Sequence, residues 1–241
     1  MNDDKTEFIV IGSRQQLQKI KSGNININSI QIPRSHVIRY LGVDLDETLS
    51  LKSMIIRKCR VAMGNIQKLN QILSTLTVEA CKTIACGLIL SHLDYANSLY
   101  YGLPKKEIRK LQIVQNMAAK VITRKDRYES ATESLKELHW LPIHLRIKYK
   151  IITTVFKTLH SQAPKYLSDK ISLNKTTIFG LRSQKNSKYL AIPRVKHMTF
   201  AARSFSVAGP QLWNFLSESL RRIEKLAEFK RDLKTFLFDQ F

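Results

Sequence analysis

The sequence lacks most features that mark a secreted, membrane-spanning or metal-bound protein. Its three cysteines, Cys59, Cys81 and Cys86, are irregularly spaced, so they predict neither a disulfide framework nor a zinc site. No apolar run approaches the roughly 18 residues of a membrane span, and residues 1–7 are too polar for a signal peptide. Internal repeats and low-complexity tracts are missing too. We therefore expect an intracellular protein, in the nucleus or cytoplasm, with no metal and no membrane partner.

Acidic residues are scarce beside basic ones. The chain of 241 residues has 19 Asp and Glu against 40 Lys and Arg, a net charge of +21 at pH 7. Residues 1–50 are neutral overall, whereas residues 51–141 carry +8 and residues 142–241 carry +13. This surplus favours nucleic acid as the partner, with an anionic membrane surface second, because Lys and Arg release counterions condensed on phosphates. A basic face that meets only solvent is the alternative.

The first fifty residues have the pattern of strands. Residues 7–12 (EFIVIG) form a short apolar run closed by glycine, which predicts a strand buried on both faces. Residues 25–32 and 37–45 predict a small β-hairpin, with Pro33 between its strands and Gly42 inside the second. Asp44 and Asp46 share a strand face but have no further ligand, so we expect solvent-facing acids rather than a metal cluster.

Helical periodicity begins at residue 51. Apolar residues recur three and four positions apart over residues 51–73, from Thr77 onward and over residues 108–122, and each pattern predicts an amphipathic helix. Ser130 and Glu133 predict a capping box on a short helix that ends near Leu138. Longer segments at 142–160, 212–220 and 226–238 also predict helices, and 164–203 predicts basic loop with short strands. Trp140 and Trp213 are expected to pack in the core.

Several phrases occur in an order typical of one family. They are residues 5–12 (KTEFIVIG), 40–43 (YLGV), 93–99 (LDYANSL), 102–104 (GLP), 111–112 with 115–116 (LQ, QN), 138–142 (LHWLP), 193–194 (PR), 205–206 (FS) and 210–214 (PQLWN). Together they resemble the C-terminal part of reverse transcriptases from Jockey-like non-long-terminal-repeat retrotransposons, and they extend over nearly the whole chain. So many phrases in one order at comparable spacing are hard to attribute to chance.

The resemblance implies a mainly α fold: a helical thumb-type bundle, a small N-terminal β-hairpin left from a polymerase palm, and a basic α+β tail. The implied divisions are residues 1–50 for the end of the palm, 51–163 for the thumb-like domain and 164–241 for the region after the thumb. Tyr40, Leu41 and Gly42 then correspond to the primer grip, although a tight bend with Tyr40 in the core is an equal alternative. Lys5 corresponds to the palm lysine that protonates departing pyrophosphate.

Catalysis in this family uses Mg²⁺ held by aspartates on earlier palm motifs, which we expect before Met1. Asp3 and Asp4 precede Lys-Thr-Glu instead of following an aromatic residue, so they are expected to be surface acids. We therefore expect no catalytic residue, no cofactor and no small-molecule substrate in this chain. Its expected partners are RNA or DNA, as template and primer, and the upstream palm and fingers of the parent polymerase.

Three basic sets are the predicted nucleic-acid contacts, because thumb helices of the family lie along the phosphates of the template and primer duplex. They are Arg57, Lys58 and Arg60; Lys105, Lys106, Arg109 and Lys110; and Arg182, Lys185, Lys188, Arg194 and Lys196. Other hypotheses stay open at this point: a domesticated nucleic-acid-binding module, a peripheral membrane or partner-helix protein that uses residues 51–73, and a truncated copy without a selected role.

Overall fold

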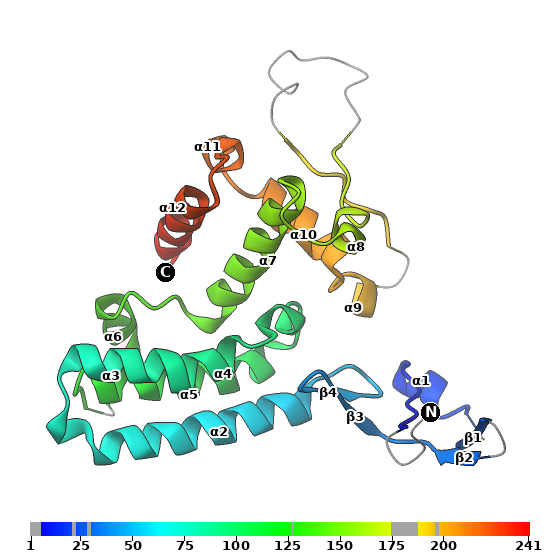
Figure 1. The fold of residues 1–241 in the computed structure, drawn as a ribbon, viewed down its shortest axis with the longest axis horizontal. Helices are drawn as coiled ribbons and strands as arrows, with labels where there is room; N and C mark the ends of the chain where they lie inside the picture. Colours follow the sequence, from blue (N-terminus) through cyan, green and yellow to red (C-terminus); the bar gives the residue numbers. More distant parts are fainter. Residues whose placement is uncertain (1–5, 21–22, 28–29, 127, 175–187, 196–197) are drawn as a thin grey trace.

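The computed structural model describes residues 6–20, 23–27, 30–126, 128–174, 188–195 and 198–241. The fold is mainly helical, as predicted, with small β-hairpins on the N-terminal side (Figure 1). Within the described residues, no helix combines the length and the apolar character needed to cross a bilayer.

Residues 24–46 form two antiparallel hairpins instead of the single one predicted. The strands are β1 (Asn24–Ile27) with β2 (Ile30–Pro33), and β3 (Val37–Tyr40) with β4 (Val43–Asp46). Leu41 and Gly42 have positive φ values of 46° and 75°, as in the two-residue type I′ turn that matches the twist of paired strands. The extended run predicted over 37–45 therefore folds back on itself at Gly42.

The buried strand predicted over residues 7–12 was wrong. Phe8 forms a single parallel bridge with Arg34, and Gly12 N donates to Glu47 O at 3.0 Å. The short helix α1 (Arg14–Leu17) follows, capped by Ser13. No sheet covers this segment in the described part of the chain, so Ile11 stays 48% exposed. The apolar run had the composition of a central strand but lacks neighbours on both sides.

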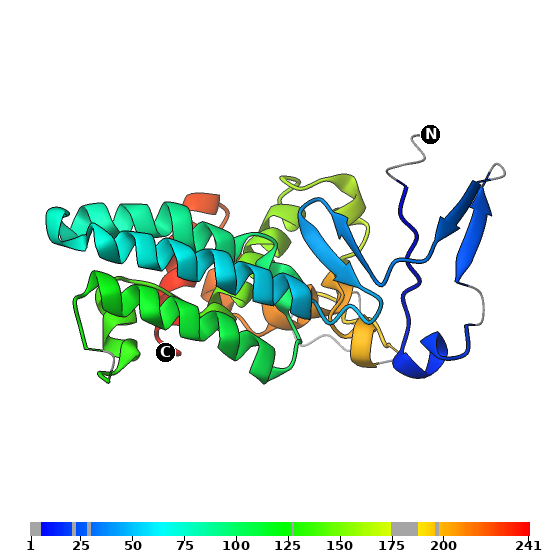
Figure 2. The same ribbon diagram turned by 90° about the horizontal axis from the view of Figure 1, so that it is seen from below.

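The helices α2 (Lys52–Gln71) and α5 (Lys105–Ile122) pack along each other and form the long axis of a bundle. A third rod lies beside them in both views (Figures 1 and 2), formed by α3 (Val78–Ala85), a π-helical stretch η3 (Cys86–Leu90) and α4 (Ser91–Asp94). Their apolar stripes meet in the core, as the spacing predicted. Thr77 caps α3 through Ala80 N, and a 3-10 turn η2 (Leu73–Thr75) joins α2 to this rod.

The helix α7 (Ile143–Leu159) connects the bundle to the C-terminal helices. It packs against α10 (Phe205–Asn214) and α12 (Leu226–Phe238). Phe156 on α7 stacks on Phe229 at 4.2 Å between ring centroids, and Trp213 lies 5.8 Å from Phe229. Trp213 and Trp140 are both buried, so the packing roles predicted for them are confirmed.

The first closing helix differs from its prediction over 212–220. α10 starts at Phe205 and contains Pro210, and a separate short helix α11 (Glu218–Arg222) begins after the cap Ser217. Gly209 packs so closely on α7 that an added Cβ would lie 3.0 Å from Val155 Cγ2. Burial against α7 therefore keeps this stretch helical in spite of the proline.

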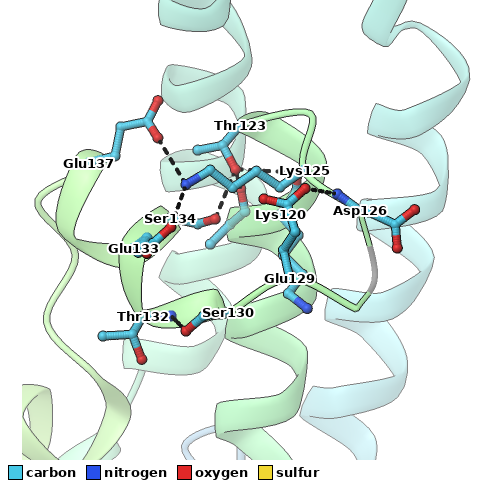
Figure 3. A network of polar contacts seen from close by, with 11 residues as sticks. Lys120, Thr123, Lys125, Asp126, Glu129, Ser130, Thr132, Glu133, Ser134 and Glu137 are labelled. Atoms are coloured by element: carbon cyan, nitrogen blue, oxygen red, sulfur yellow. Dashed lines mark hydrogen bonds and ion pairs between the residues drawn. The ribbon is translucent and has the colours of Figure 1, made fainter.

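The capping box predicted at Ser130 and Glu133 does not form. Ser130 caps α6 (Ala131–Glu137) through Thr132 N, while Glu133 and Glu137 both turn to Lys125 at 3.5 and 3.6 Å (Figure 3). Lys125 offers Glu133 a charged partner, which is electrostatically stronger than a backbone amide of the same helix.

The described part of residues 164–203 has less strand structure than predicted. It contains the short helices α8 (Lys165–Ser168) and α9 (Met198–Ala201) and one bridge between Leu173 and Leu190. The hydrogen bonds of Leu190 with the Asn214 side chain, 2.8 and 2.9 Å long, tie this region to α10.

Candidate nucleic-acid interface

The turn at Tyr40, Leu41 and Gly42 projects from the end of the hairpin β3–β4. Tyr40 is 63% exposed and Leu41 73% exposed, so the alternative that placed Tyr40 in the core was wrong. Gly42 has a positive φ, and a Cβ there would lie 3.4 Å from the Tyr95 hydroxyl. The sequence phrase thus marks a turn whose Tyr40 and Leu41 side chains are exposed, while Gly42 faces Tyr95.

Two side chains from the helical bundle hold this turn in place. The Tyr95 hydroxyl donates to Leu41 O, and Arg57 Nη2 donates to Gly42 O at 2.9 Å. Arg57 also donates to both Asp44 carboxylate oxygens, at 2.7 and 3.1 Å. The turn is therefore bonded to α2 through Arg57 and to the end of α4 through Tyr95.

The first basic set is divided by burial. Arg60 is exposed and without an ion pair in the described part of the chain, whereas Arg57 is already engaged with Asp44. Lys58 is only 4% exposed, donates to Tyr95 O and lies 5.3 Å from the Tyr95 and Tyr100 ring centroids. Its assignment as a phosphate contact was wrong, because its ammonium points into the bundle.

Burial gives Lys58 an altered acidity. Desolvation, helped by the nearby charge of Arg57, lowers its pKa from 10.5 to about 8, and Asp94 only partly opposes this. Asp94 itself is held by Arg146, whose Nε donates to Asp94 Oδ1 at 2.8 Å. Lys58 is therefore buried without an ion pair among the described residues, next to the partly exposed pair of Asp94 and Arg146.

The carboxylates of β4 are structural rather than solvent-facing, which corrects the expectation for Asp44 and Asp46. Asp46 accepts from Thr48 N, Ser50 N and Leu51 N at 3.3, 3.0 and 2.7 Å, at the start of α2. Burial acts to raise the pKa of Asp46, but these hydrogen bonds outweigh it and hold the pKa below its ordinary value. Within the described residues, no group of His, Cys, Asp and Glu has the arrangement of a metal site.

The second basic set lies on the first turns of α5. Lys105, Lys106 and Arg109 are exposed and have no ion pair among the described residues, whereas Lys110 Nζ is paired with Glu107 at 2.7 Å. The helix begins after Pro104, which offers no side-chain cap. Three cations therefore surround the positive end of an 18-residue helix. Their charges repel one another and the helix dipole, so an anion bound there would be stabilised.

The third basic set falls mostly outside the described residues. Arg182, Lys185 and Lys196 lie there, as does the palm-motif lysine, Lys5. Of the same set, Lys188 and Arg194 are exposed, and the Lys188 carbonyl accepts from Trp213 Nε1 at 2.9 Å. These two side chains remain available to an anionic partner.

Other arginines hold the molecule together, and sequence reasoning gave no sign of it. Arg203 donates to Leu49 O, Tyr101 O and Leu99 O at 3.2, 3.2 and 3.4 Å, and so joins three segments. Arg221 is buried against the Tyr189 ring at 3.9 Å. A count of positive residues alone overstates the charge available to a ligand.

Comparison of the chain with protein-family models, with curated proteins and with solved structures finds no match. The family resemblance therefore depends on the sequence phrases, and the site on the geometry described above.

Proposed function

We propose that this chain holds template and primer nucleic acid through phosphate contacts, as the C-terminal part of a retrotransposon reverse transcriptase would. In this proposal it acts inside the cell, in the nucleus or cytoplasm, beside the palm and fingers of its parent enzyme. Alone it extends no primer, because the aspartates that bind Mg²⁺ in that family have no counterpart among its motifs.

The observation that carries the proposal is the cluster of Lys105, Lys106 and Arg109 on α5. All three are exposed, and none has an acidic partner in the described part of the chain. Backbone phosphates require positive charge at helical spacing rather than base-specific geometry. The helix N-terminus adds its own partial positive charge. One phosphate group there would therefore reduce the repulsion among the three cations and the helix end at once.

The exposed turn supports the same proposal. Its carbonyls at Leu41 and Gly42 are occupied by Tyr95 and Arg57, which leaves Tyr40 and the Leu41 side chain free for contact. An aromatic ring that is mostly exposed provides a surface on which a base or sugar can stack. The fixed attachment to α2 keeps that surface in a constant position relative to Arg60.

The test is the salt dependence of binding, measured by fluorescence anisotropy with a labelled duplex of random sequence. Half a dozen phosphate contacts predict a slope of log affinity against log salt near about −5. The triple variant Lys105→Gln, Lys106→Gln, Arg109→Gln should flatten the slope by up to about one unit per lost contact. A matched triple removes three exposed cations elsewhere: Arg14→Gln, Lys19→Gln, Lys225→Gln.

The proposal requires that the α5 variant lose more slope than the matched variant, with both folded by circular dichroism. Equal losses would assign binding to net charge alone, and a flat salt response of the unaltered chain would refute nucleic-acid holding. Anionic vesicles that bind more tightly than nucleic acid would favour the membrane hypothesis instead.

A further inference from the structure

A cleft of about 570 Å³ lies where the first turns of α5 and α7 approach each other. Its apolar wall includes Tyr101, Ile108 and Ile147. Its volume falls in the range of about 300–1,000 Å³ that is usual for ligand sites. No part of the sequence reasoning pointed to it, since its walls come from segments some forty positions apart.

The walls of the cleft are fixed before any ligand arrives. Gln112 on α5 accepts from Ile143 N of α7 at 2.8 Å and donates to Gln115 and Asn116 at 2.9 and 2.8 Å. Gln115 is fully buried and donates to Leu141 O at 2.9 Å. These bonds tie the two helices together beside the cleft, so a ligand would not have to order it.

The rim of the cleft is positive. Lys105, Arg109 and Lys148 line it, and no acidic side chain does. None of the three has an ion pair in the part of the chain that the structure describes, while the neighbouring Glu107 is buried and paired with Lys110. The N-terminus of α5 lies at the same rim and adds its partial positive charge, whereas the first amide of α7, Ile143 N, is already bonded to Gln112.

Aromatic rings complete the lining. Tyr101 is half-buried, and His144 lies on the first turn of α7. Desolvation and the charge of Lys148 lower the pKa of His144, which favours its neutral ring. Tyr100 also lines the cleft, and its buried hydroxyl has no hydrogen-bond partner among the described residues. The cleft thus combines flat rings with three free cations.

We propose that this cleft holds one unpaired nucleotide of a single-stranded nucleic acid. The base stacks against Tyr101 and His144, and its phosphate is bound by Lys105, Arg109 and Lys148. A duplex cannot fill the site, because its bases are stacked and paired in the helix interior. The inference rests on the proposed function and adds a preference for single strands or unpaired ends.

The test compares one labelled single-stranded oligonucleotide with a blunt duplex of the same sequence, using the full chain. Lys148→Gln should weaken single-strand binding about tenfold, the effect of one charged hydrogen bond, with less effect on the duplex. Arg109→Gln should weaken binding of both probes, because the proposed function also uses Arg109 as a duplex contact. Lys106→Gln is the matched control, because Lys106 is exposed on the same turn but lies outside the cleft. It should affect both probes equally.

A base analogue separates stacking from charge. A fluorescent 2-aminopurine in the single strand should be quenched on binding, and His144→Ala should reduce the quenching while the salt slope stays unchanged. Inorganic phosphate that competes as well as a mononucleotide would show a site for phosphate alone and overturn the proposal.

The remaining outcomes distinguish the two proposals. If Lys148→Gln and Lys106→Gln weaken both probes alike, the cleft holds no nucleotide, while nucleic-acid holding through phosphates stands. If the unaltered chain binds neither probe, the proposed function fails and this inference fails with it. If Lys148→Gln abolishes binding to phosphatidylserine vesicles and leaves both nucleic-acid probes bound as before, the ligand of the cleft is a lipid headgroup and the proposal is wrong.

Discussion

Replacement of the buried Lys58 by methionine should change the dependence of stability on pH. The variant keeps the apolar stem and removes the ammonium that donates to Tyr95 O. In the folded chain the pKa of Lys58 is lowered to about 8, whereas the unfolded chain has the ordinary value of 10.5. Keeping this group charged at neutral pH therefore destabilises the folded state.

The sign of the effect follows from proton binding. Below pH 8 both states are protonated and the cost is complete, while between pH 8 and 10.5 only the unfolded state still holds the proton. Stability therefore rises with pH across this window. A difference of 2.5 units (10.5 minus 8) sets an upper bound of about 3 kcal/mol at 1.36 kcal/mol per unit, and local relaxation reduces the expected gain to about 1–2 kcal/mol.

Urea unfolding followed by circular dichroism at pH 7.5 and pH 10 measures this gain. The unaltered chain should become more stable relative to Lys58→Met at the higher pH. Lys52→Met is the control, because Lys52 is exposed on the same helix and should retain the pH response of the unaltered chain. An identical pH response in Lys58→Met and the unaltered chain would refute the assignment of a depressed pKa to this lysine.

Three further changes test the structural roles described above. Asp46→Ala removes the hydrogen bonds at the start of α2 and should lower the free energy of unfolding in urea by about 1–2 kcal/mol at pH 7. The difference in stability from the unaltered chain should shrink as the pH falls through the lowered pKa of Asp46. Gly102→Ala, with φ of 71° and a Cβ 2.6 Å from Arg203 Cγ, should lower the melting temperature, whereas Gly64→Ala, which meets no atom within 4 Å, should raise it. Trp213→Ala should cost about 3–5 kcal/mol, and a loss below 1 kcal/mol would contradict its place in the core.

The long helices could be predicted from the sequence because each apolar stripe indicates a helix without information about the rest of the fold. α2, α5 and α7 each follow the spacing of three and four, and α3 begins after Thr77, where the pattern predicted a helix. The predictions failed where a residue distant in the sequence determines the local structure. Lys125 turns Glu133 away from its own helix, and the packing of Gly209 on α7 extends α10 across a proline.

The candidate site could be predicted only in part. The exposed cations of α5 were identified from their clustering, but Lys58 was assigned to the surface although it stands four positions after Met54 and four before Ala62, both fully buried. That spacing is a signal for burial that its charge obscured. The cleft beside α5 had no local signal at all, because Lys148 and Arg109 meet only through the packing of two helices.

The contacts of Arg203 have a consequence for how the chain reaches its fold. One guanidinium bonds the carbonyls of Leu49, Leu99 and Tyr101, across as many as 154 positions of sequence. Contacts of such separation form late, because closing the intervening loop costs more conformational entropy than forming a local helix does. During synthesis, the bonds from Arg203 therefore cannot form until this residue has left the ribosome, whereas Arg57 and Tyr95 can already join the hairpin to the bundle.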